Sequence, residues 1–176
     1  HKGRGIYLPY QKFLELWHAA NKKITVTEPG SQAPTAAVLR GGHYKGHVQG
    51  QIARFEVEYK IEALQKKWSS IPFALIGVAV ESYEFSDPRA LLETADSGYR
   101  LHLPERGQYT LKINFSVRVN DSPGKKALGF LIPRTSSSKL ELSIPEEELR
   151  IQVEPMKAAS QSLTDQGKTQ VLAFLG

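Results

Sequence analysis

Two stretches of the chain alternate strictly between apolar and polar residues. From Tyr109 to Val119 every odd-numbered residue is apolar or aromatic, and every even-numbered residue is polar or charged. From Phe55 to Ala63 the alternation repeats, with a charged residue at each even-numbered position. Because successive side chains of a strand point to opposite faces, both stretches predict strands with one buried and one solvated face. Two such strands need a shared core, so we predict an all-β protein.

One stretch in the N-terminal part of the chain has helical spacing. Between Pro9 and Ala20 the apolar residues fall on one stripe, which predicts a single amphipathic helix. A stretch containing Pro, Gly and Ser follows and is typical of a linker. We therefore divide the chain into a helical segment at 1–27, a linker at 28–35, a β-sandwich at 36–154 and a tail at 155–176.

Shorter elements complete the predicted sandwich. The run from Ile71 to Val80 is apolar on both faces, which predicts a central strand covered on both sides. Gly50 and Gln51 predict a tight turn after two extended pieces separated by Gly41 and Gly42. We also expect one helical turn at 90–95, a hairpin loop at 104–107, and short strands at 128–132, 140–144 and 149–153. The stretch 169–175 predicts a further strand, which either returns to the sheet or starts a following domain. This spacing favours an antiparallel sandwich of the immunoglobulin-like or jelly-roll-like kind.

Composition narrows the possible functions only slightly. The absence of cysteine excludes disulfides, thiolate catalysis and cysteine-bound zinc. A net charge of +5 favours anionic partners, but the basic residues are dispersed as short pairs, which disfavours nucleic acid. The longest apolar run is too short to cross a bilayer, so no transmembrane segment is expected in this sequence. Since the chain starts at His1 and its only methionine is Met156, we expect it to begin inside a longer reading frame or behind a removed tag.

A basic and aromatic group of residues is the candidate ligand-binding site. It comprises His43, Tyr44 and Lys45, together with Trp68 in the hydrophilic bend KKWSS. Aromatic rings beside cations can stack on sugars and attract anionic groups. The alternative for Trp68 is that it folds back and plugs the end of the sandwich, because a tryptophan side chain buries a large area.

Catalytic and metal sites find little support. His43 and His47 would lie about 13 Å apart on a regular strand, too far for one metal ion unless a turn at Gly46 closes the gap and His102 joins. We therefore expect no metal and no cofactor. Several acids gather near the end of the long apolar run and are candidates for a glycosidase-like acid and base pair: Glu81, Glu84, Asp87, Glu93 and Asp96. We interpret them instead as a solvated connection between strands.

Three segments carry a resemblance to a known class of protein. They are the alternating EVEYKIEAL with the following IPFALIGVAV, then SGYRLHLPERGQYTLKINFSVRV, and then GFLIPRTSSSKLELSIP. Together they resemble β-rich segments of large uncharacterised bacterial cell-envelope proteins. The resemblance implies a sandwich module beside other domains, at the periplasm or cell surface, with a cytoplasmic location left open; it implies no catalytic residues.

Three functional hypotheses follow. The first is a non-catalytic structural or binding module of a larger envelope-associated protein, whose partners are other domains of the same polypeptide. The second is a sandwich that binds an anionic polysaccharide or lipid through the residues named above. The third is a glycoside-active enzyme domain.

Overall fold

The computed structural model describes residues 11–12, 35–122, 125–145, 158–163 and 169–175, and nearly all of its regular structure is β-strand. The predicted N-terminal helix, most of the linker and the strand expected at 149–153 lie outside these residues, apart from a helical Gln11 and Lys12. The strands are β1 (Ala37–Gln49), β2 (Ile52–Ala63), β3 (Ser69–Phe73), β4 (Ala79–Phe85), β5 (Leu91–Ala95), β6 (Gly98–Leu103), β7 (Gly107–Arg118), β8 (Asn120–Ser122), β9 (Lys125–Ala127), β10 (Ser137–Ile144), β11 (Ala158–Leu163) and β12 (Thr169–Leu175).

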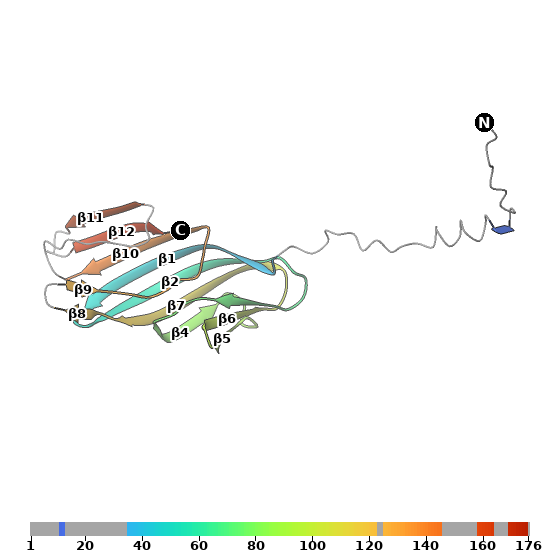
Figure 1. The fold of residues 1–176 in the computed structure, drawn as a ribbon, viewed down its shortest axis with the longest axis horizontal. Helices are drawn as coiled ribbons and strands as arrows, with labels where there is room; N and C mark the ends of the chain where they lie inside the picture. Colours follow the sequence, from blue (N-terminus) through green and yellow to red (C-terminus); the bar gives the residue numbers. More distant parts are fainter. Residues whose placement is uncertain (1–10, 13–34, 123–124, 146–157, 164–168, 176) are drawn as a thin grey trace, which may run out of the picture. The chain divides into compact units, whose positions relative to one another are not determined.

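The strands form one large sheet and two small ones. The large sheet has seven strands in the order β11-β12-β10-β1-β2-β7-β4, and its neighbours are antiparallel except for β1 and β10, which are parallel (Figure 1). A three-stranded sheet has the order β3-β6-β5, and β8 and β9 pair on their own. The terminal stretch at 169–175 therefore returns to the large sheet as β12 between β10 and β11.

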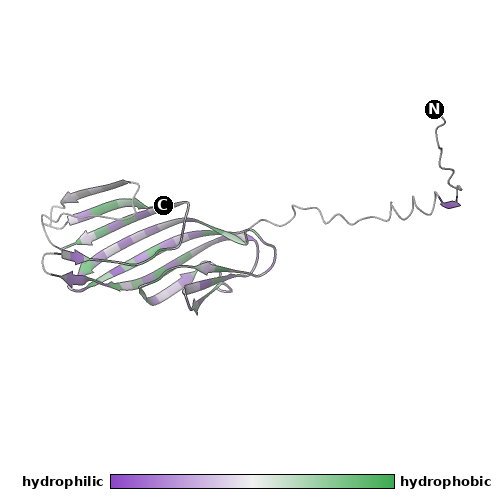
Figure 2. Cartoon of the chain, in the orientation of Figure 1, coloured by the Kyte–Doolittle hydropathy of each residue, from purple (hydrophilic) through white to green (hydrophobic). Residues whose placement is uncertain are grey.

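The two alternating stretches form adjacent strands at the centre of the large sheet. β2 and β7 pair over their whole length, so that Phe55 lies opposite Phe115 and Val57 opposite Ile113. All four side chains are buried, whereas the polar residues between them, Glu56 and Asn114, are exposed. Figure 2 shows the matching alternation of hydrophobic and hydrophilic residues along the strands. This confirms the predicted strands and the all-β fold.

The small sheet β3-β6-β5 covers the apolar face of the large sheet. Phe73 of β3 meets Tyr59 of β2 edge-on, with ring centroids 4.9 Å apart. Leu101 and Leu103 of β6 are fully buried in the same cluster. We call the covered face of the large sheet the inner face, and the opposite face the outer face.

The apolar run from Ile71 to Val80 is not the single central strand that its composition predicts. It divides into β3, which belongs to the small sheet, and the start of β4, which is an edge strand of the large sheet. Gly77 lies between them with a φ of 80°, a backbone conformation that favours glycine. Within the run only Phe73 and Leu75 are buried, so most of its apolar residues lie outside the core.

Three shorter predictions are also wrong. Residues 90–95 contain strand β5 in place of a helical turn, because Leu91–Ala95 pair with β6. Residues 104–107 connect the two sheets and do not close a hairpin, since β6 pairs with β3 and β5 whereas β7 pairs with β2 and β4. The stretch 128–132 makes only an isolated bridge between Leu131 and Ile76.

The connection between the sheets is held by a tyrosine. The Tyr109 hydroxyl donates a hydrogen bond to the backbone oxygen of Glu105 at 2.8 Å, four residues earlier. Arg89 bridges the Glu105 carboxylate at 2.7 Å and the Asp87 carboxylate at 2.8 Å. The loop after β4 and the loop before β7 are therefore fixed to each other.

Candidate ligand-binding face

The outer face of the large sheet is polar and is organised in cross-strand rows. Each row runs perpendicular to the strands and contains residues that lie opposite one another in the strand pairing. The His43 row contains Phe174, Lys139, His43, Glu58, Lys112 and Glu84; the Lys45 row contains Leu172, Glu141, Lys45, Glu56, Asn114 and Ser82; the His47 row contains Gln170, Ser143, His47, Arg54 and Ser116. Lys45 lies between two carboxylates in its row, and Lys112 lies between two carboxylates in the His43 row.

Ion pairs fix part of this face. The Glu141 carboxylate accepts a hydrogen bond from Lys139 at 2.5 Å and lies 3.1 Å from His43 Nε2. The Lys139 ammonium, and to a lesser degree His43, hold the pKa of Glu141 below its usual value. Glu141 is therefore an ionised acceptor that holds two neighbouring side chains in place.

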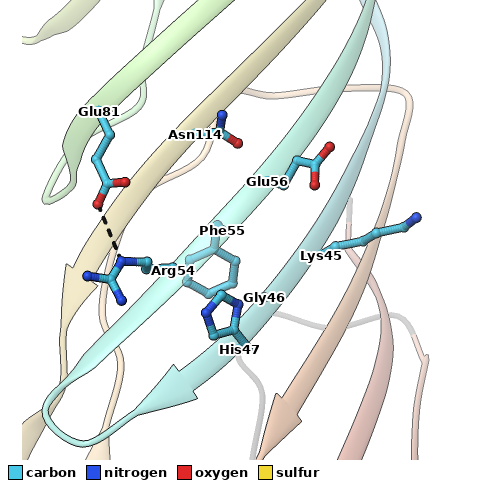
Figure 3. Close-up of a pocket in the computed structure, with 8 residues that line it drawn as sticks. All are labelled: Lys45, Gly46, His47, Arg54, Phe55, Glu56, Glu81 and Asn114. Atoms are coloured by element: carbon cyan, nitrogen blue, oxygen red, sulfur yellow. Dashed lines mark ion pairs between the residues drawn. The ribbon is translucent and has the colours of Figure 1, made fainter.

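A first hollow of about 310 Å³ opens on the outer face over β1, β2, β7 and β4 (Figure 3). Its polar lining comes from Lys45 and His47 of β1, Arg54 and Glu56 of β2, Glu81 of β4 and Asn114 of β7. Arg54 points toward Glu81, with 3.8 Å between Nε and Oε1, whereas Lys45 extends away from that pair (Figure 3). Asn114 donates a hydrogen bond to Ser82 at 2.9 Å.

A second hollow of about 240 Å³ lies over β10, β12 and β11. Its lining comprises Lys139, Glu141, Ser160, Ser162, Gln170 and Leu172. Glu141 lies directly opposite Lys45 in the parallel pairing of β10 with β1. The two hollows are therefore adjacent, with Lys45 lining the first and Glu141 lining the second.

His43 and Lys45 lie on this face, but Tyr44 does not. Tyr44 is 1% exposed and points into the core, where its hydroxyl lies 2.8 Å from that of Tyr59 and also bonds Ser138. Residues next to each other in a strand face opposite sides, so Tyr44 cannot share a surface with its neighbours. Its assignment as a ligand-binding residue is wrong.

Burial of the two phenols makes stability depend on alkaline pH. Burial raises the pKa of Tyr44 from 10.0 to about 12, and raises that of Tyr59 still further. The folded state thus keeps the phenol protons that the unfolded state loses above pH 10. The contribution of the two phenols to the free energy of unfolding is therefore fully present below pH 10 and decreases as the pH rises above it. Between about pH 10 and 12 the stability difference between the protein and its Tyr44→Phe variant should shrink by up to about 1.4 kcal/mol per pH unit. Urea unfolding at several pH values measures this, and a constant difference would contradict it.

The phenol pair also predicts an asymmetry at neutral pH. Tyr44→Phe leaves the buried Tyr59 hydroxyl without its partner and should cost about 1–3 kcal/mol. Tyr59→Phe should cost less, because the Tyr44 hydroxyl keeps its bond to Ser138. Equal midpoint shifts of the two variants in urea would count against this arrangement.

Trp68 is exposed and lies apart from His43 and Lys45. Its exposed fraction is 55%, so the interpretation as a buried plug is wrong. It immediately precedes β3 of the small sheet, which covers the inner face, whereas Lys45 lies on the outer face. The structure therefore does not bring Trp68 and Lys45 into one site.

The candidate metal and catalytic groups are dispersed. His102 lies on β6 of the small sheet and bonds Glu93 at 2.7 Å, away from His43 and His47 on β1. Among the residues that the structure describes, no group of three or more His, Asp or Glu side chains could hold a metal ion. The described part of the chain also contains no helix long and apolar enough to cross a membrane.

Several residues of this face were not nominated from the sequence. Arg54, Glu56 and Asn114 occupy outward-facing positions of β2 and β7, where a polar side chain normally only keeps a strand face soluble. The signal that could have identified Arg54 and Glu56 is the pairing of their strand with the one containing Lys45. Gln170 lies in the tail, whose place in the sheet the sequence left open.

No protein-family model matches the sequence, and no curated protein matches it significantly. Among solved structures, a two-domain M1 zinc metallopeptidase variant bound to L-tryptophan is similar at 12% identity and a TM-score of 0.53, over 82% of this chain and 40% of that chain. A two-domain variant bound to L-arginine gives 12% identity and a TM-score of 0.50, over 79% and 39%. An M1 zinc metallopeptidase from Deinococcus radiodurans gives 13% and 0.49, over 82% and 40%. These similarities concern the fold alone, and the chain spans about 40% of each neighbour.

Proposed function

We propose that this chain is a non-catalytic binding module of a larger, envelope-associated bacterial protein, and that it binds through the outer face of the large sheet. The observation that carries the proposal is that this face is polar, exposed to solvent and contains two hollows. Its side chains stand on paired strands and are partly fixed by ion pairs at Glu141 and Arg54, so the binding groups are positioned before a partner arrives.

The surroundings of the acidic residues support a non-catalytic role. Asp87 is bound by Arg89, which lowers its pKa, although a general acid needs a raised one. Glu93 is paired with His102 on the small sheet, and Glu81 with Arg54 on the large sheet. Three of the five candidate acids are thus held by different cations in different places.

The fold similarity supports membership of a larger polypeptide. The two neighbours with TM-scores of 0.53 and 0.50 are two-domain proteins, and this chain matches about 40% of their length. If the parent polypeptide of this chain is organised like these two-domain neighbours, it contains at least one further domain beside the sandwich. The envelope location derives from the resemblance of the strand segments.

A test of this proposal compares binding to purified peptidoglycan sacculi and to phosphatidylglycerol vesicles by co-sedimentation. In one variant Lys45→Glu is combined with Glu56→Lys, which exchanges a cross-strand pair of the outer face and keeps the net charge. The matched control exchanges Glu93 and Arg100, a cross-strand pair of the small sheet. We expect the native chain and the control to pellet, and the outer-face variant to lose most of its bound fraction.

Two results would contradict the proposal. One is no sedimentation with either material, or equal loss in the two exchanged variants. The other is hydrolysis of the sacculi by the native chain that disappears on Glu84→Gln or Asp87→Asn, which would favour the enzymatic alternative.

A further inference from the structure

The two hollows of the outer face lie on the same rows. The first is bordered by Lys45, Glu56 and Asn114 of the Lys45 row and by Arg54 of the His47 row. The second is bordered by Glu141 and Leu172 of the Lys45 row and by Gln170 of the His47 row. With strands about 4.8 Å apart, the Lys45 row extends about 24 Å from β12 to β4. A linear ligand lying across the strands can therefore contact both hollows at once.

The charges along these rows disfavour a strongly anionic ligand. Lys45 lies between Glu56 and Glu141, one on each neighbouring strand. Lys112 likewise lies between Glu58 and Glu84. A polyanion lying across the strands would meet carboxylates on both sides of each of these two lysines. Repulsion from the carboxylates would offset much of the attraction to the lysines.

The lining instead suits a ligand whose groups both donate and accept hydrogen bonds. Gln170 and Asn114 offer amides, Ser160 and Ser162 offer hydroxyls, and Glu141 is an ionised acceptor. Phe174, 44% exposed in the adjacent His43 row, offers an aromatic ring beside the second hollow. Sugar hydroxyls both donate and accept, and the C–H face of a pyranose ring packs on aromatic rings.

We infer that the outer face binds an uncharged linear glycan across the strands along the Lys45 and His47 rows. This inference rests on the proposed binding function and specifies its ligand class. Because the contacts are hydrogen bonds to uncharged groups, binding should change little with ionic strength. A complex held by phosphate or carboxylate groups would weaken strongly as salt is added.

Calorimetric titration with cellohexaose, chitohexaose and maltohexaose at low and high salt tests the inference. We expect at least one hexasaccharide to bind with a Kd that changes by no more than about twofold between the two salt concentrations. Asn114→Ala and Gln170→Ala, one in each hollow, should each weaken binding by about three- to tenfold. Ser70→Ala, on the exposed face of the small sheet, should leave the Kd unchanged.

Failure of all three hexasaccharides to bind would overturn the inference, as would a loss confined to only one of the two hollow variants. Binding of polygalacturonate or phosphatidylglycerol vesicles alone, abolished by salt and by Lys45→Glu, would also overturn it while leaving the proposed binding module in place. Absence of binding to every material, sacculi included, would remove both.

Discussion

Replacing Phe55 by Ala is expected to lower the free energy of unfolding by about 3–5 kcal/mol, measured by urea denaturation. Phe55 is 3% exposed, and its ring lies 5.2 Å from that of Phe115 and 5.1 Å from that of Phe130. Phe130 belongs to the segment that pairs with Ile76 between β3 and β4. Removing the Phe55 ring would leave a cavity under that segment.

The control for this prediction is Phe174→Ala, which makes the same Phe-to-Ala substitution on the outer face. Phe174 is 44% exposed, so its loss should cost about 0.5 kcal/mol or less. Equal losses at the two positions would show that the inner face is not the sealed side of the sheet.

The second large effect is expected at Gly46, whose missing side chain makes room for Phe55. A Cβ built at Gly46 would lie 2.4 Å from Cε1 of Phe55 and 2.9 Å from Cδ1 of Leu142. Gly46→Ala should therefore cost about 1–3 kcal/mol through overpacking. The measurement is again the midpoint and slope of urea unfolding.

A double-mutant cycle identifies the clash as the cause. In the Phe55→Ala background the main obstacle is gone, so Gly46→Ala should cost much less than in the native chain. Gly129→Ala is the matched control, because a Cβ there meets nothing within 4 Å. Additive losses in the cycle, or a loss at Gly129 equal to that at Gly46, would refute this packing.

The sequence was sufficient for the central strands. The alternation in β2 and β7 is long enough that only an extended backbone places Phe55, Tyr59, Ile113 and Phe115 together in the core. The tight turn at Gly50 is likewise confirmed, with a φ of 62° between β1 and β2. These elements depend on local periodicity and turn chemistry, which a sequence displays directly.

Strand partners were harder to predict because apolar content does not reveal which sheet a strand joins. The run containing Ile71 and Val80 is apolar throughout, yet Gly77 divides it between two sheets. β6 and β7 are separated by a short loop that is typical of a hairpin, but they pair with different strands. Pairing depends on contacts distant in sequence, and a single chain carries little record of them.

The candidate site was predicted only in part. His43 and Lys45 do face the same side of β1, as two-residue spacing requires, but the same rule excludes Tyr44. Trp68 was grouped with them by composition alone, and the structure separates it because the next residue starts a strand of the other sheet.

The central claim is that one face of the large sheet is open and the other sealed, and thiol labelling tests it most directly. The chain has no cysteine, so single substitutions along β2 give unambiguous probes. We expect the exposed Glu56→Cys to react with a maleimide nearly as fast as an unstructured peptide, and the half-buried Glu58→Cys to react within about tenfold of that rate. Val57→Cys should react about a hundredfold more slowly than Glu56→Cys, since it needs the core to open. Equal rates at the three positions, or protection at 56 and 58, would contradict the account.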